Sequence, residues 1–143
     1  MHPKPLVCIA GCNGFIGQHI VSNLTNVKLY GLDQNKSDKI PSLALDLSKP
    51  ISDSVISTLP NIDVLIFLVG LAHDKGKKAD SELFERVNFL SLKNLLNKLR
   101  KLDNLPDKII FSSTISVYGE RYSQQYYDES LLPNPYSPYA VTK

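Results

Sequence analysis

The chain ends in Tyr139-Ala-Val-Thr-Lys143, a tyrosine and a lysine four residues apart. On a helix this spacing places the phenol and the ammonium on one face. A neighbouring ammonium stabilises the phenolate and lowers the pKa of the tyrosine toward neutrality, as a catalytic base requires. The pair therefore predicts the proton-accepting group of a dehydrogenase-type oxidoreductase.

A glycine-rich loop lies between a predicted strand at residues 6–10 and a predicted helix at residues 15–24. Glycines at three-residue steps let a backbone turn tightly and approach a pyrophosphate, whose charge the helix N-terminus stabilises. Asp33 follows the next predicted strand, where a carboxylate accepts ribose hydroxyls and repels a 2′-phosphate. Together these features predict an NAD site that includes the loop residues Gly11, Asn13, Gly14, Phe15, Ile16 and Gly17.

Asp46 and Leu47 follow a short strand predicted at residues 43–45. In a cofactor site, a carboxylate here can meet the adenine amino group, and the apolar side chain can cover the adenine ring. A turn that leads into the next helix is an equally open interpretation of this pair.

The strand predicted at residues 64–69 ends in Leu68, Val69 and Gly70. Cofactors bind at the carboxyl edge of such sheets, so these three residues are expected to line the NAD site. Gly70 would leave room for the cofactor, although a glycine also commonly ends a strand.

Thr114 closes the strand predicted at residues 108–111, at the same edge of the sheet. Its hydroxyl can hydrogen-bond a substrate hydroxyl and help to hold a developing carbonyl oxygen. Hydroxyls at strand ends often only cap loops. The downstream pair Tyr139 and Lys143 favours a catalytic role for Thr114.

These residues are positioned by strands that alternate with helices. Alternation predicts an α/β domain with a doubly wound parallel, Rossmann-like sheet. Asn88 lies on the longest predicted helix, either as a buried polar residue that orders water or as an exposed one. The predicted strands are 6–10, 27–32, 43–45, 64–69 (expected at the centre) and 108–111, and the helices are 15–24, 51–59, 80–102 and one that begins near residue 139.

The composition indicates one ordinary globular domain, which we assign as an NAD-binding domain over residues 1–143. The formal net charge of +2 is spread along the chain without clustered aromatic residues, so no nucleic-acid partner is predicted. Cys8 and Cys12 are expected to be small, partly buried thiols, and they have no companions at metal-ligand spacing. The longest apolar stretch is too short to span a bilayer, so a cytoplasmic protein without a membrane partner is expected.

In order along the whole chain, the motifs resemble those of the extended short-chain dehydrogenase/reductases, in the nucleotide-sugar epimerase/dehydratase branch. The resemblance implies that Tyr139 is the base, that Lys143 lowers its pKa and holds the nicotinamide ribose, and that Thr114 orients the sugar. It implies proton removal from the hydroxyl at sugar carbon four and hydride transfer to NAD, with a nucleotide-sugar substrate. The matching segments are 11–17, Asp33, 46–47, 63–71, 87–88, 111–119 and 138–143.

The residues after Thr114 depart from the dehydratase pattern. Dehydratases of this family usually carry an Asp-Glu pair there, whereas this chain has Ile115 and Ser116, which cannot exchange protons at neutral pH. This leaves a 4-epimerase or a keto-sugar reductase, and residues 137–143 look most like UDP-N-acetylglucosamine 4-epimerases, followed by UDP-galactose 4-epimerases. A non-catalytic dinucleotide-binding module stays open, although it would not need the Thr114, Tyr139 and Lys143 set.

Members of the family are roughly twice as long as this chain. By resemblance we therefore expect the N-terminal, NAD-binding part of an enzyme, truncated after the fifth strand and without a substrate lobe. We expect this polypeptide alone to bind NAD weakly and not to turn over sugar. The resemblance also implies a homodimer formed through the long helix.

Overall fold

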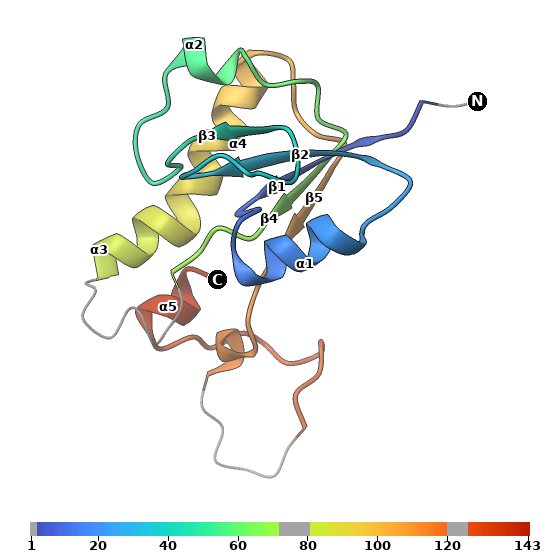
Figure 1. Ribbon diagram of the computed structural model, residues 1–143. Helices are drawn as coiled ribbons and strands as arrows, with labels where there is room; N and C mark the ends of the chain where they lie inside the picture. Colours follow the sequence, from blue (N-terminus) through green and yellow to red (C-terminus); the bar gives the residue numbers. More distant parts are fainter. Residues whose placement is uncertain (1–2, 72–80, 120–125) are drawn as a thin grey trace.

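Five parallel strands form the central sheet of the computed structural model, which describes residues 3–71, 81–119 and 126–143 (Figure 1). Their order across the sheet is β3-β2-β1-β4-β5. The chain therefore winds outward from β1 in one direction and then crosses back to build β4 and β5 on the other side. The strands are β1 (Leu6–Ala10), β2 (Lys28–Asp33), β3 (Ser42–Ala44), β4 (Val64–Phe67) and β5 (Lys108–Phe111).

Helices cover both faces of this sheet, which confirms the predicted doubly wound α/β fold. On one face, α1 (Phe15–Asn23) contributes Ile20 and Val21, which pack on the apolar side chains of β1. On the other face, α2 (Asp53–Ile56) and α4 (Ser91–Lys101) pack over the strands (Figure 1). Because the order reverses between β1 and β4, the carboxyl ends of these two strands are where such folds bind ligands.

The core on the α4 face consists of large apolar side chains without solvent exposure. Leu65 and Phe67 of β4 meet Leu95 and Leu99 of α4. Burying a side chain of this size contributes about 1.5–3 kcal/mol to stability. Cys8 lies in the same cluster, and burial raises the pKa of its thiol to about 12, so the thiol stays protonated at neutral pH. Cys8 and Cys12 are both fully buried rather than partly buried as predicted.

Two predictions were wrong in detail, namely which strand lies in the middle of the sheet and how long the helix after β3 is. The middle strand of the sheet is β1, whereas the more apolar β4 lies between β1 and β5. The helix predicted at residues 51–59 is the single turn of α2, capped by the Ser52 side chain, which accepts a hydrogen bond from the backbone N–H of Val55. Leu59 precedes a proline, which disfavours helical backbone angles there.

The long helix is not regular. From residue 81 onward it consists of α3 (Ser81–Phe84), a π-helical segment η1 (Glu85–Leu90) and α4. π-helical turns are rare and often occur at functional sites. The predicted start at Asp80 lies outside the described residues. In the part of the chain that the structure describes, no helix is both long and apolar enough to cross a membrane.

Candidate functional site

The glycine loop connects β1 to α1 at the point where the sheet order reverses. Gly11 adopts a positive φ of 89°, which a side chain would strain, and its N–H donates to the carbonyl of Leu32 at 2.7 Å. A Cβ at Gly11 would lie 3.3 Å from the Leu68 backbone, so the loop runs close to the end of β4. Gly14 is the exposed N-cap of α1, and it leaves the first N–H groups of the helix open to a ligand.

Asp33 fixes the glycine loop against the loop that follows β2. One of its carboxylate oxygens accepts the backbone N–H of Asn13 at 2.9 Å, and the other accepts that of Gln34 at 2.8 Å. The Asn13 side chain in turn donates to the carbonyl of Asn35 at 2.9 Å. A carboxylate has about four lone-pair positions, so Asp33 keeps acceptor capacity for two ribose hydroxyls.

A cavity of about 380 Å³ lies at the carboxyl ends of β1 and β4. Most of the predicted cofactor residues line it, and they come from four separate segments of the chain. These residues are Gly11, Gly14, Asp33, Asp46, Leu47, Leu68, Val69 and Gly70. The structure thus brings together the glycine loop, the acidic end of β2, the end of β3 and the end of β4.

Four of the six predicted glycine-loop residues do not line this cavity, and neither do Tyr139 and Lys143. Asn13 acts on it indirectly, through the bond to Asp33, and Gly17 is buried beneath the loop. Phe15 and Ile16 are 82% and 55% exposed at the start of α1. Membership of the glycine loop alone could not show which residues face the ligand.

Five further residues line the cavity and were missed: Gln34, Leu45, Ser48, Leu71 and Val87. Four of them directly adjoin predicted residues, so adjacency in the sequence was a usable signal. Val87 comes from the π-helical segment, and no local pattern indicated that it would reach the cavity.

Asp46 fits both interpretations given above. It forms a turn after β3, and it also lines the cavity. Its carboxylate accepts hydrogen bonds from the Ser48 hydroxyl at 2.6 Å and the Ser48 N–H at 3.0 Å, and it lies 3.4 Å from the Lys49 ammonium. The hydroxyl of Ser48, followed by the other two groups, keeps the pKa of Asp46 below its ordinary value. The side chain is therefore a fixed anion on the cavity wall.

Lys143 lies beside Gly70, which is one of the residues that line the cavity. Its ammonium donates to the carbonyl of Ser112 at 3.1 Å and lies 5.4 Å from the centre of the Phe111 ring. A Cβ at Gly70 would come within 2.9 Å of this nitrogen. Burial lowers the pKa of the ammonium. The Ser113 hydroxyl holds the same residue through its carbonyl at 3.0 Å.

Tyr139 lies on α5 (Pro138–Val141), whose first turn is capped by the Ser137 side chain. Its ring packs edge-on against Phe84 with the centroids 6.2 Å apart. The prediction that one helix carries both Tyr139 and Lys143 was wrong in extent, because α5 ends at Val141 and Lys143 follows the C-cap. Contacts with the ends of β4 and β5, rather than helical spacing, position Lys143.

Thr114 caps the short 3₁₀ helix η2 (Ile115–Tyr118). Its hydroxyl accepts the N–H of Ser116 and donates to the Ser116 hydroxyl, both at 3.3 Å. The structure therefore shows the capping role that was the alternative to catalysis. A hydroxyl has two acceptor positions, so Thr114 can still accept one hydrogen bond from a substrate.

Asn88 joins three elements around the site, and the exposed alternative for this residue was wrong. It is fully buried on η1, where its carbonyl oxygen accepts the N–H of Leu71 at 2.6 Å. Its amide donates to the Thr142 hydroxyl at 3.2 Å and to the Leu71 carbonyl at 3.4 Å. Asn88 thus ties the segment after β4 and the end of α5 to the long helix.

Replacing Asn88 by leucine is expected to lower the free energy of unfolding by about 2 kcal/mol, because it leaves the partly buried Leu71 N–H without its side-chain acceptor. Equilibrium unfolding in urea measures the change. The control is Asn94→Leu, the same substitution at an exposed position of α4. Equal stability losses in the two variants would show that the hydrogen bonds of Asn88 contribute nothing beyond helix packing.

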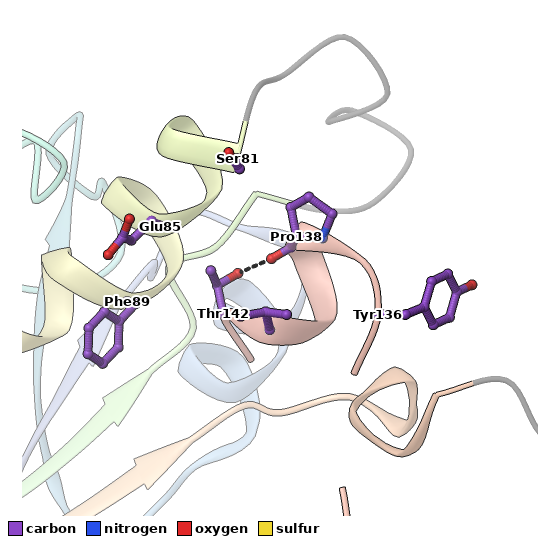
Figure 2. Close-up of a pocket in the computed structure, with 7 residues that line it drawn as sticks. Ser81, Glu85, Phe89, Tyr136, Pro138 and Thr142 are labelled. Carbon is purple, nitrogen blue, oxygen red and sulfur yellow. Dashed lines mark hydrogen bonds between the residues drawn. The ribbon is translucent and has the colours of Figure 1, made fainter. Parts of the chain in front are cut away.

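A second hollow, of about 530 Å³, lies between the long helix and α5 and contains none of the predicted cofactor residues. Figure 2 shows Glu85 and Phe89 on the long helix and Pro138 and Thr142 on α5, with the Thr142 hydroxyl bonded to the Pro138 carbonyl at 2.9 Å. Phe89 and Val141, on its two sides, are 49% and 64% exposed. This hollow shares no lining residue with the cavity at the sheet edge.

The model of the NAD dependent epimerase/dehydratase family matches residues 7–143. The chain is 29% identical to a protein of Methanocaldococcus jannaschii whose name assigns it as a UDP-glucose 4-epimerase, over 96% of this chain and 47% of that protein. It is 26% identical to a Bacillus subtilis protein named as a UDP-glucose epimerase, over 96% and 48% of the two chains. The chain therefore spans about half the length of the curated relatives that it matches.

Among solved structures, the chain resembles the UDP-glucose 4-epimerase of Thermus thermophilus in complex with NAD, with a TM-score of 0.77 and 28% identity. The match covers 96% of this chain and 47% of that one. The UDP-Glc/GlcNAc 4-epimerase of Campylobacter jejuni gives a TM-score of 0.80 at 21% identity, over 98% and 46% of the two chains, which supports the fold.

Proposed function

This chain belongs to the NAD dependent epimerase/dehydratase family, and we propose that it forms the NAD-binding part of a nucleotide-sugar 4-epimerase. The observation that carries the proposal is the cavity at the ends of β1 and β4, with Asp33 in its wall and the Lys143 ammonium beside Gly70. An acceptor for ribose hydroxyls in the cavity wall and a cation next to the wall residue Gly70 support one shared ligand site. The relatives that cover this chain are named for UDP-glucose epimerisation, which supports a UDP-sugar as the substrate.

The residues present fit NAD. Open N–H groups at the start of α1 suit a pyrophosphate, and the Asp33 carboxylate suits two free ribose hydroxyls but repels a 2′-phosphate. Leu47, a buried residue in the cavity wall, offers an apolar surface for the adenine ring. Lys143, with Gly70 beside it, suits the nicotinamide ribose.

When bound, NAD supplies a hydride acceptor. In the proposed reaction Tyr139 accepts the proton of the sugar hydroxyl at carbon four. Thr114 accepts a hydrogen bond from the substrate with its remaining lone pair. Ile115 and Ser116 carry no group that exchanges protons at neutral pH, so we do not propose a dehydration.

Calorimetric titration of the chain with NAD tests the cofactor site. The wild type is expected to bind one NAD, and Asp33→Ala to weaken binding at least about tenfold, because charge-assisted bonds to the ribose are lost. Asp107→Ala, which removes an exposed carboxylate just before β5, is the control and should bind as the wild type does. Unfolding curves for each variant separate a lost contact from a disordered loop. Absence of binding to a folded wild-type chain, or equal binding by Asp33→Ala, would contradict the assignment.

We also propose that a second copy of the chain covers the hollow between the long helix and α5. The exposed Phe89 and Val141 on its two sides provide apolar surface for such a contact. Phe89→Asp is expected to convert a dimer to a monomer, and Arg100→Asp, at an exposed position of α4 outside the hollow, to leave it intact. Analytical ultracentrifugation measures the masses, and a wild-type chain that is monomeric throughout would refute the proposal.

A further inference from the structure

A third hollow, of about 540 Å³, runs between the loop that follows β3 and one side of the long helix. Its helical wall carries side chains at three- and four-residue steps, which places them on one face. These include Arg86 on η1 and Asn94, Asn97, Lys98 and Lys101 on α4. Lys49 faces them from the loop. We define these six residues as the basic groove.

The basic groove has a surplus of positive charge. Two of its four cations are compensated, because Lys49 pairs with Asp46 at 3.4 Å and Lys98 pairs with Asp53. Among the residues that the structure describes, neither Arg86 nor Lys101 has a carboxylate within ion-pair distance. The charge of Lys101 also acts on Asp53, so Arg86 is the least compensated cation of the groove, and its guanidinium fork suits the oxygens of a phosphate.

The uncharged residues of the hollow indicate which kind of anion would bind there. Asn94 and Asn97 are three residues apart and offer both donors and acceptors, which suits phosphate or sugar oxygens. Ile51 and Leu90 add apolar surface to the same hollow. The described lining contains no aromatic side chain on which a nucleic-acid base would stack. The volume lies within the range of small-molecule sites.

We propose that the basic groove binds a phosphate-bearing small molecule, at a site distinct from the proposed cofactor cavity. Ser48 lines both hollows, so the two sites adjoin at the loop after β3. The site does not depend on the proposed epimerase function, because none of the six groove residues lines the cofactor cavity.

Nuclear magnetic resonance of the isotope-labelled 143-residue chain, titrated with inorganic pyrophosphate at constant ionic strength, tests the proposal. Saturable shifts are expected for the side-chain amides of Asn94 and Asn97, separately from any response of the glycine loop at Gly14. The double variant Arg86→Gln/Lys101→Gln is expected to weaken binding in the groove at least about tenfold, the effect of losing charge-assisted hydrogen bonds. Its response at Gly14 should be unchanged.

The matched control is Lys93→Gln/Arg100→Gln, which removes two positive charges from α4 outside the groove. Because exposed charges elsewhere on the helix are largely screened, this variant should change the groove affinity less than about twofold. Shifts confined to the glycine loop, shifts that do not saturate, or equal losses in the two double variants would each overturn the proposal.

Discussion

Gly17→Ala is expected to lower the free energy of unfolding by about 3 kcal/mol, the upper range for forcing a methyl group into a packed site. A Cβ at this position would lie 2.1 Å from the Gly11 carbonyl oxygen and 2.9 Å from two backbone atoms of Cys12. All three contacts are with backbone, so no side chain can rotate away. The start of α1 must move off β1, and the loop that offers N–H groups to the pyrophosphate moves with it.

Thermal unfolding and NAD titration measure the two consequences of Gly17→Ala. NAD affinity is expected to fall at least about thirtyfold, equivalent to about 2 kcal/mol. Gly14→Ala is the control for stability, because its Cβ would meet only the Gly11 carbonyl, at 3.2 Å, and Gly14 has a φ of −69°. Equal stability of the Gly17→Ala and Gly14→Ala variants would mean that the loop adapts and that the close approach is not required.

The sequence predicted elements well where local patterns determine them. β1 and β5 have the predicted bounds, since short apolar runs flanked by glycine or polar residues leave little choice of ends. The order of the strands in the sheet was harder to predict. The apolar character of β4 indicates an interior strand, but it does not indicate that β1 is the middle one. The π-helical segment could not be predicted from the sequence. Its residue Asn88 hydrogen-bonds Leu71 and Thr142, which are far away in the sequence, so local patterns carry no signal for it.

The candidate site shows the same division between local and long-range determinants. The end of each strand was predictable, so residues such as Asp33 and Gly70 were found and the structure places both in one cavity. The position of Lys143 was not predictable from the four-residue spacing, which assumes an uninterrupted helix. Its ammonium is instead held by the Ser112 carbonyl, a contact between segments 31 residues apart.

The contacts of Gly70, Asn88 and Lys143 show that the Gly70 end of the cavity depends on segments that are far apart in the sequence. A Cβ at Gly70 would approach the Lys143 ammonium at 2.9 Å and the Asn88 carbonyl oxygen at 3.4 Å. Three elements therefore meet around one glycine, and a side chain there would displace either the cation or the amide that holds α5. Local sequence patterns could identify each residue but not this three-way contact.

On the proposed function, Tyr139→Phe is expected to reduce 4-epimerase turnover by about 10²- to 10⁴-fold in an active protein that includes residues 1–143, the usual contribution of a general base. The substitution removes only the hydroxyl, so the edge-on packing against Phe84 should persist and NAD binding should change little. Conversion of UDP-glucose to UDP-galactose measures turnover, and calorimetry measures the cofactor affinity. Tyr126→Phe, at a side chain that is 94% exposed, controls for loss of a tyrosine hydroxyl.

Lys143→Met is expected to have a different effect from Tyr139→Phe. It removes the ammonium beside Gly70 that is proposed to hold the nicotinamide ribose, so the NAD affinity measured by calorimetry should fall. Tyr139→Phe should instead lower turnover at every pH with little change in NAD affinity, because only the proton acceptor is absent. Turnover by Tyr139→Phe within about fivefold of the wild type, well below the contribution of a general base, would show that another group removes the proton.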